Sequence, residues 1–138
     1  MKTEFYMNFP DGLPIGTAQH KGERVIMQHG HPVIVHYKKK NVVQARKMFE
    51  AELLPNRPKQ PLTGAIRIFV CVYFDVKSSN LWGKYKTTRP DADNYCKELF
   101  DAMESCGFFL SDAQIVDVRI VKRYAEQGSI YIKLEGIE

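Results

Sequence analysis

The sequence has no long apolar run, and this absence excludes the simplest kind of membrane protein. No stretch approaches the roughly 20 apolar residues that a membrane-spanning helix needs. The first residues, from Met1 to Phe5, lack the apolar region of a secretory signal. We therefore expect a cytoplasmic protein with no membrane partner.

The sequence is also poor in cysteine. It contains three, which cannot all pair with one another: Cys71, Cys96 and Cys106. No Cys-x-x-Cys or mixed Cys/His spacing indicates structural zinc, so we expect reduced, partly buried thiols. His29, His31 and His36 lie close together in the sequence. Without a fourth ligand in the pattern, ordinary surface histidines are favoured over a metal site.

A strong net charge is missing as well. The 20 Lys and Arg exceed the 16 Asp and Glu by a formal charge of +4, which is compatible with nucleic-acid binding but does not establish it. The distribution is more informative. Basic residues gather at 38–40, 46–47 and 77–89, whereas acidic residues gather between 91 and 117. Basic groups around a compact acidic site are typical of metalloenzymes that cleave phosphodiesters.

The 138 residues, of which 44% are hydrophobic, are sufficient for one domain with its own core. Hydrophobic periodicity and turn residues predict the order β-ββ-α-β-α-β-β. This order indicates a single α/β (α+β) domain over 1–138, with a mixed sheet and two main helices. The expected strands are 3–9, 24–28, 33–37, 65–74, 116–124 and 129–134; the expected helices are 40–54 and 92–106, with a long loop at 75–90.

Two carboxylates mark the start of the second predicted helix. Asp91 and Asp93 repel each other unless a cation or another positive group lies between them. Helix capping is the alternative, because acids also bind the free N–H groups at a helix N-terminus. Lys97 follows Asp93 by one helical turn, on the same face, where it could serve the chemistry or form a solvated ion pair.

Asp112 lies in a short polar segment between an aromatic cluster and the next predicted strand. Considered alone, it is explained as a turn or cap residue. Alternatively, the carboxylates of Asp91, Asp93 and Asp112 come from two segments that flank one helix. They could converge on a hard, oxygen-preferring cation such as Mg²⁺.

The residues around these acids resemble one known family. The motif consists of Asp91-Ala92-Asp93-Asn94, Lys97, Phe100-Asp101-Ala102, Gly107-Phe108 and Asp112-Ala113-Gln114-Ile115-Val116-Asp117. It is similar to that of the RusA family of Holliday junction resolvases. The resemblance is dense from Arg89 to Lys122, weaker from Ser129 to Glu138, and vague over the first 60 residues.

The resemblance implies a homodimer that resolves four-way DNA junctions by paired, symmetric nicks. It implies Mg²⁺ as cofactor, with Mn²⁺ as a substitute. Carried over by position, Asp91, Asp93 and Asp112 are catalytic acids and metal ligands, and Lys97 is the essential lysine. Asn94 and Gln114 would have orienting roles. The setting would be recombination and repair, or processing of branched phage DNA, in the cytoplasm of a bacterium or a phage-infected host.

The sequence departs from the family pattern at two places. Ser111 stands where the best-known member has a second acid, and the 75–89 loop is longer and less arginine-rich. Trp82 and Tyr85 in this loop could stack on exposed bases or pack on their own domain. Lys38 and Lys39 could contact phosphates or simply begin a helix. The candidate DNA contacts are Lys21, Arg24, Lys38, Lys39, Lys77, Trp82, Lys84, Lys86 and Arg89.

Two other function classes remain open at this point. One is a structure-selective nuclease acting on flaps or forks, and the other is a junction-binding module that does not cut. The presence of all three acids and of Lys97 favours an active enzyme.

Overall fold

The structure is a computed structural model that describes residues 1–15, 21–38 and 40–137, with side-chain surroundings for 1–15, 25–34 and 42–137. Its elements follow the order predicted from the sequence. The strands are β1 (Lys2–Phe9), β2 (Lys21–Gln28), β3 (His31–Lys38), β4 (Ala65–Asp75), β5 (Ile115–Ala125) and β6 (Gly128–Ile137). The helices are α1 (Lys40–Leu53) and α2 (Ala92–Ser105), with single 3₁₀ turns η1 (Leu54–Asn56), η2 (Ser79–Leu81) and η3 (Asp112–Gln114).

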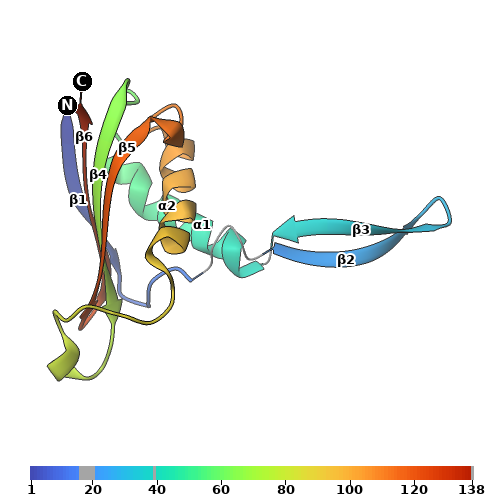
Figure 1. Ribbon diagram of the computed structural model, residues 1–138, viewed down its shortest axis with the longest axis horizontal. Helices are drawn as coiled ribbons and strands as arrows, with labels where there is room; N and C mark the ends of the chain where they lie inside the picture. Colours follow the sequence, from blue (N-terminus) through green and yellow to red (C-terminus); the bar gives the residue numbers. More distant parts are fainter. Residues whose placement is uncertain (16–20, 39, 138) are drawn as a thin grey trace.

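Four strands form the main sheet in the order β1-β6-β4-β5. The pairs β1–β6 and β4–β6 are antiparallel, whereas β4–β5 is parallel. The parallel pair is joined by a crossover that contains α2, as parallel neighbours require. The mixed sheet with two main helices confirms the predicted fold class. In Figure 1 the helices lie on one face of the sheet, and the two ends of the chain lie side by side.

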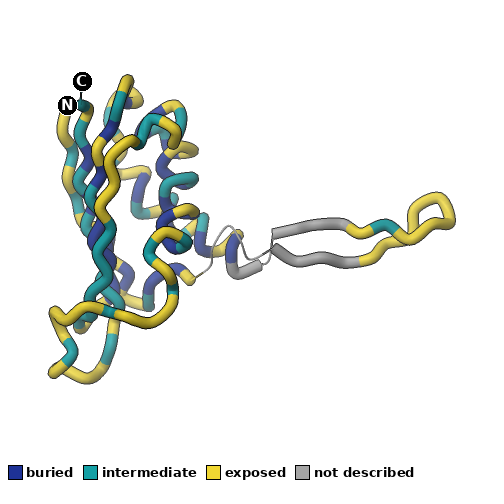
Figure 2. Tube along the Cα trace, viewed as in Figure 1, coloured by how far each residue is buried: buried dark blue, intermediate teal, exposed yellow. Residues whose placement is uncertain are grey.

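The core lies between the sheet and the helices (Figure 2). Alternate residues of β4 and β6 point toward the helices, because side chains alternate between the faces of a strand. From α2, the core receives the apolar stripe that the helical spacing predicts, because residues three and four apart share a face. The buried α2 stripe comprises Tyr95, Leu99, Ala102 and Met103, continued by Cys106 after the helix.

An ion pair joins the two helices inside this core. Arg46 of α1 donates from Nε to the carboxylate of Glu98 in α2, and Glu98 is fully buried. A second guanidinium nitrogen of Arg46 lies 3.6 Å from Asp101. The sequence places Arg46 in a basic cluster, but its charge is already paired with acidic side chains of α2.

Strands β2 and β3 form a separate two-stranded sheet, which projects from the rest of the molecule in Figure 1. The predicted hairpin around residues 29–32 is confirmed. Its turn contains His29 at φ 52° and Gly30 at φ 77°, and positive φ at two central residues is typical of a tight hairpin turn.

The three cysteines are free and buried, as expected. In the part of the chain that the structure describes, no helix is long and apolar enough to cross a membrane.

Candidate active site

The N-terminal end of α2 opens onto a cleft of about 890 Å³. Asp91 and Asn94 line it from the helix side, and Lys86 and Arg89 line it from the preceding segment. The cleft also receives Asp11, Gly12, Leu13, Ile15, Phe74, Asp75, Pro90, Tyr95 and Tyr124. An acidic helix start is therefore combined with basic side chains in one cavity, as the charge distribution predicts.

Asp91 precedes the first turn of α2 with extended backbone, φ −64° and ψ 143°. This is the backbone of an N-cap residue, but among the described residues the Asp91 side chain accepts no capping hydrogen bond. The capping explanation therefore does not account for its carboxylate. Asp91 and Asp93 are both exposed, and Asp91 lines the cleft, so its oxygens are accessible to a ligand there.

A lysine of β5 holds the segment before Asp91 in place. The Lys122 ammonium donates to the carbonyl oxygens of Thr88 at 2.8 Å and Pro90 at 2.7 Å. Sequence reasoning missed this role, because the pattern of β5 does not show which loop its lysine contacts. Lys122 thus fixes the position of Asp91 from a strand that lies more than thirty residues further along the chain.

Lys97 lies one turn into α2 and is exposed. Its ammonium donates to Asn94 Oδ1 at 3.4 Å. Within the described residues Lys97 forms no ion pair with Asp93, so the solvated ion pair considered from the sequence is not present. The contact instead agrees with an orienting role for Asn94, which directs the lysine toward the cleft end of the helix.

Tyr124 reports the electrostatic character of the cleft. A hydrogen bond with Thr88 is the main cause that lowers the pKa of Tyr124; burial opposes it, and the nearby charges of Lys86 and Lys122 lower the pKa further. The Lys86 ammonium lies 5.2 Å from the Tyr124 ring centre and 5.3 Å from that of Phe74. The wall of the cleft therefore favours negative charge, as a site for DNA phosphate requires.

Asp112 lies at the other end of α2. Its backbone N–H donates to Glu104 Oε1 at 2.7 Å, and Glu104 belongs to the last turn of the helix. A helix rises 1.5 Å per residue, so Asp93 and Glu104 are about 16 Å apart along the axis. The structure therefore brings Asp91 and Asp93 together but does not bring Asp112 to them within one chain.

The turn that presents Asp112 is closed by hydrogen bonds that the sequence did not reveal. Gln114 Oε1 accepts from the N–H groups of Leu110 and Ser111, both at 3.0 Å. Its amide donates to the carbonyls of Leu62 and Gly64 at 3.0 Å. The Ser111 side chain accepts a hydrogen bond from the Ala113 N–H group. Ser111 and Gln114 together form a capping box. These contacts agree with the orienting role expected for Gln114 and give Ser111 a structural role of its own.

A bound Mg²⁺ would need several oxygen ligands close together. No group of three His, Cys, Asp or Glu that could hold a metal exists among the described residues of one chain. Asp91 and Asp93 nevertheless fit this ion, because Mg²⁺ prefers oxygen ligands and is often held by one or two carboxylates together with water. The convergence of all three acids considered from the sequence is not found within one chain.

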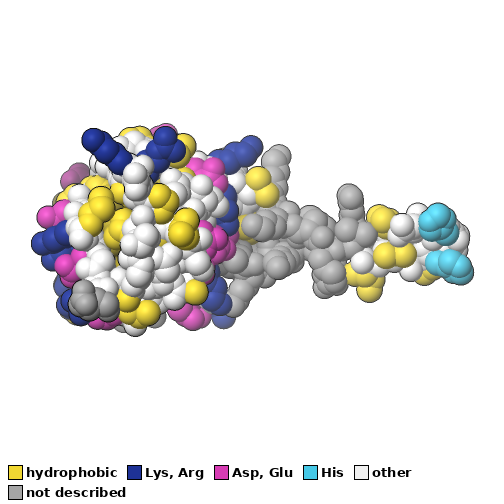
Figure 3. Space-filling view, turned by 90° about the horizontal axis from the view of Figure 1, so that it is seen from above, with side chains coloured by type: hydrophobic (Ala, Val, Ile, Leu, Met, Phe, Trp, Pro, Cys, Tyr) yellow, Lys and Arg dark blue, Asp and Glu magenta, His cyan; other side chains and the backbone are white. Residues whose placement is uncertain are grey.

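The other candidate DNA contacts fall into two groups. Lys86 and Arg89 line the cleft with Asp91, and Lys84 is exposed on the same segment. Lys21, Arg24 and Lys38 belong to the hairpin strands, but their side-chain surroundings lie outside the described part, as does Lys39 altogether. His29 and His31 are exposed, and histidine side chains lie at the end of the projecting hairpin (Figure 3).

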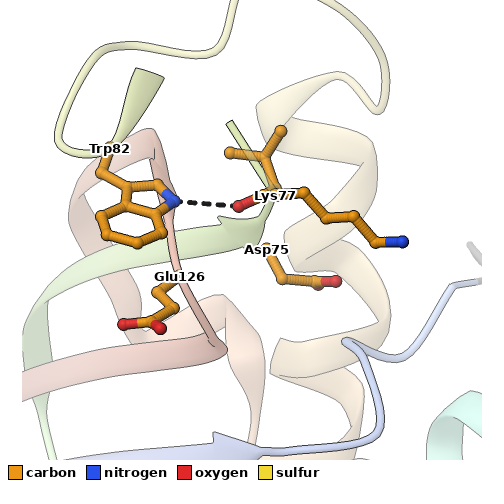
Figure 4. A pocket seen from close by; sticks show the side chains of 5 residues that line it. Asp75, Lys77, Trp82 and Glu126 are labelled. Carbon is orange, nitrogen blue, oxygen red and sulfur yellow. Dashed lines mark hydrogen bonds between the residues drawn. The ribbon is translucent and has the colours of Figure 1, made fainter. Parts of the chain in front are cut away.

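Trp82 and Tyr85 are partly packed onto their own domain. The Trp82 indole donates to the Val76 carbonyl at 2.9 Å. It lines a second pocket of about 430 Å³ with Asp75, Lys77 and Glu126 (Figure 4). Tyr85 stacks on the Arg123 guanidinium, 4.3 Å from the ring centre, yet 65% of the tyrosine remains exposed. Trp82 is 39% exposed, so both aromatic residues keep a surface on which a base could stack.

Comparisons with known proteins show which family this chain resembles. The family model described as "Endodeoxyribonuclease RusA" matches residues 11–135. The crossover junction endodeoxyribonuclease rusA of Lactococcus phage r1t is 31% identical over 90 residues, which cover 64% of this chain and 69% of the relative. RusA of Escherichia coli K12 is 50% identical over 40 residues, covering 29% and 33% of the two chains. An uncharacterised protein of Bacillus subtilis, YqaN, is 29% identical over 93 residues, covering 59% and 65%.

Proposed function

Since this chain belongs to the RusA family of endodeoxyribonucleases, we propose that it resolves four-way DNA junctions by cutting two strands symmetrically, in a reaction that requires Mg²⁺. The observation that carries the proposal is the cleft in which Asp91 and Asn94 face Lys86 and Arg89. It combines acidic ligands with basic groups for the DNA backbone. The named relatives from the Lactococcus phage and E. coli are crossover junction endodeoxyribonucleases.

Each residue of the site has a separate role in the proposed cleavage. Asp91 and Asp93 would hold the cation, which polarises the scissile phosphate and makes bound water more acidic. Lys86 and Arg89 bind the phosphates on either side and restrict the strand to the cleft. Lys97, oriented by Asn94, stabilises negative charge as it develops on the phosphate oxygens. Lys122 fixes the position of the Asp91 backbone at the wall of the cleft.

Catalysis also depends on the precise position of these groups. A displacement of about 1 Å can cost about a hundredfold in rate. The cleft is suited to precise positioning, because Asp91 is placed by a helix start on one side and by a strand lysine on the other. The α2 helix is itself fixed by its buried stripe and by the Arg46–Glu98 ion pair.

The decisive test uses synthetic DNA. Purified protein is incubated with a labelled four-way junction, a linear duplex of the same arm sequences, and a flap, each with Mg²⁺ or with EDTA. We expect paired nicks at symmetric positions in the junction alone, and only with the metal. Equal cutting of flaps or duplex would replace this function with that of a broader nuclease. Binding of the junction without any cut in Mg²⁺ would replace it with that of a binding module.

A further inference from the structure

The main sheet has a face that points away from both helices, and it carries several aromatic side chains. In Figure 1 the two helices lie on the opposite face. Along β4, the side chains of Ile68, Val70 and Val72 are buried toward the helices. Phe69 and Tyr73 point the other way, because side chains alternate between the faces of a strand. The surface to which they belong is the open face of the sheet.

The aromatic rings of the open face form a continuous surface across three strands. Tyr131 of β6 lies opposite Tyr6 of β1 and opposite Cys71 of β4, and residues directly opposite each other share a face. The ring centres of Tyr6 and Tyr131 are 4.9 Å apart, and those of Phe69 and Tyr131 are 5.9 Å apart. Tyr6 is 58% exposed, whereas Phe69, Tyr73 and Tyr131 are half-buried. Water therefore reaches a surface of flat rings.

Two arginines of β5 border these rings. Arg119 and Arg123 lie opposite Phe69 and Tyr73 of β4. The Arg119 guanidinium is 5.3 Å from the Phe69 ring centre. The Arg123 guanidinium is 4.3 Å from the ring centre of Tyr85, so the exposed Tyr85 continues the aromatic surface beyond β5. Among the described residues, neither arginine forms an ion pair.

Other charged residues of these strands largely offset one another. Arg67 pairs with Asp117 at 2.7 Å and with Glu135 at 3.5 Å. Lys133 lies directly opposite Glu4. The excess positive charge beside the aromatic rings therefore comes from the two bordering arginines.

We propose that the open face binds an unpaired strand of DNA, whose bases stack on the aromatic rings and whose phosphates are held by the two arginines. Every base has a flat face, so stacking on aromatic side chains accepts any sequence. A four-stranded sheet that stacks bases on exposed aromatics is also the arrangement of a common RNA-binding module. The strand is DNA because the chain belongs to a family of endodeoxyribonucleases.

The open face and the cleft are separate surfaces. Phe74 and Tyr124 line the cleft, and each is the direct neighbour of a residue on the open face, Tyr73 and Arg123. Because neighbouring side chains of a strand point to opposite faces, the sheet itself lies between the two surfaces. The open face goes beyond the function proposed above: it holds single-stranded segments of branched DNA and needs neither metal nor cutting.

Strand binding is measured without metal. A short fluorescein-labelled oligothymidylate is titrated with the protein in EDTA, and its fluorescence anisotropy is followed. Unlabelled single strand should displace the probe, whereas a duplex should not, because the bases of a duplex are stacked on one another. Two phosphate contacts predict a slope of about −1.4 for the logarithm of affinity against that of salt concentration. Absence of binding, or displacement by duplex as readily as by single strand, would overturn the proposal.

Substitutions then test which side chains hold the strand. Phe69→Leu and Tyr6→Leu keep an apolar side chain but remove the flat ring, and each should raise the dissociation constant at least about fivefold. Arg119→Gln should reduce the magnitude of the salt slope by about 0.7. Val43→Ala, at an exposed apolar residue of α1, is the control. Unchanged affinity in both leucine variants, with a lower midpoint of thermal unfolding, would show that the rings only stabilise the sheet and would overturn the proposal.

Photo-crosslinking locates the strand on the native protein, so it does not depend on the folding of a variant. One thymidine of the probe is replaced by 5-iododeoxyuridine, which couples to a stacked aromatic ring under ultraviolet light. The crosslinked peptides should come from β1, β4, β6 or the segment that contains Tyr85. Crosslinks confined to the cleft residues from Arg89 to Tyr95 would overturn the proposal. A protein that binds the strand but nicks no junction would refute the proposed function and leave the open face as assigned.

Discussion

The two ends of α2 present acids by different means. At the N-terminal end, Asp91 directly precedes the helix and Asp93 lies in its first turn, and Lys122 holds the preceding carbonyls from β5. At the C-terminal end, Asp112 stands on a separate turn, which Glu104 and Gln114 attach to the helix and to the segment before β4. A charged lysine secures the first end, whereas side-chain oxygens that accept backbone N–H groups secure the second.

One helix can position acids at both of its ends even though these acids do not contact one another. The centre of α2 is fixed by a buried stripe and by Glu98, which pairs with Arg46. Each end can then carry exposed carboxylates without contributing to the core. Acids that contribute little to folding are available for function, and substitutions there should separate activity from stability.

Apart from Asp91→Asn, the largest effect on activity is expected for Asp112→Asn. The substitution keeps the shape of the side chain but removes its charge, and Asp112 is exposed. Junction nicking should fall at least about a hundredfold, equivalent to about 2.7 kcal/mol of lost transition-state stabilisation. The midpoint of thermal unfolding should stay close to that of the wild type. Glu126→Gln, at an exposed acid of the second pocket, is the matched control and should keep full activity.

Lys122→Met tests how the N-terminal end is held. The variant keeps the length and the apolar stem but loses both hydrogen bonds to Thr88 and Pro90. Groups that orient ligands typically affect activity by about 10–100-fold when removed. We expect kcat to fall within this range while KM for the junction changes less. Lys133→Met, at a lysine of β6, controls for the loss of one charge. A kcat equal to that of the control would show that Lys122 does not position Asp91.

Glu104 allows the corresponding test at the C-terminal end. Glu104→Ala removes the acceptor of the Asp112 N–H, whereas Glu104→Gln keeps an oxygen in the same place. The alanine variant should lose about tenfold in nicking rate, or about 1.4 kcal/mol, and the glutamine variant should recover most of it. If the nicking rate falls equally in both variants, the charge of Glu104 matters and the hydrogen bond does not.

Gln114→Ala should have the smallest effect on the chemistry and a measurable effect on stability. It leaves the N–H groups of Leu110 and Ser111 without their acceptor and two carbonyls without their donor. Because the site is only partly buried, we expect a loss of about 1–2 kcal/mol in the free energy of unfolding. Denaturant unfolding beside Gln127→Ala, an exposed turn residue, measures it. A loss no greater than in the control would mean that the turn closes without Gln114.

The sequence predicted the fold well because its signals are local. The α2 stripe from Tyr95 to Cys106 follows helical spacing, and all of its members are buried. The predicted end of this helix at Cys106 is one residue from the observed end at Ser105. The turn around Gly30 and the order of the elements along the chain likewise follow from neighbouring residues.

The arrangement of the site depends on contacts between distant segments, and these the sequence could not supply. The sequence predicts the helix between Asp93 and Asp112, but it does not reveal that the length of this helix keeps the two acids apart within one chain. The hydrogen bond from Lys122 to Pro90 spans 32 residues, and Arg46 reaches Glu98 across 52. Residue identities indicated the chemistry, whereas tertiary packing decides which acids share a cleft.

The most direct test of the central claim is to measure binding and cutting of one four-way junction by Asp91→Asn. The cleft retains Lys86 and Arg89 in this variant, so the junction should bind within about threefold of the wild-type affinity, a difference of about 0.7 kcal/mol. Nicking in Mg²⁺ should fall at least about a thousandfold, or about 4 kcal/mol. Cutting at the wild-type rate would contradict the assignment of this end of α2 as the catalytic centre.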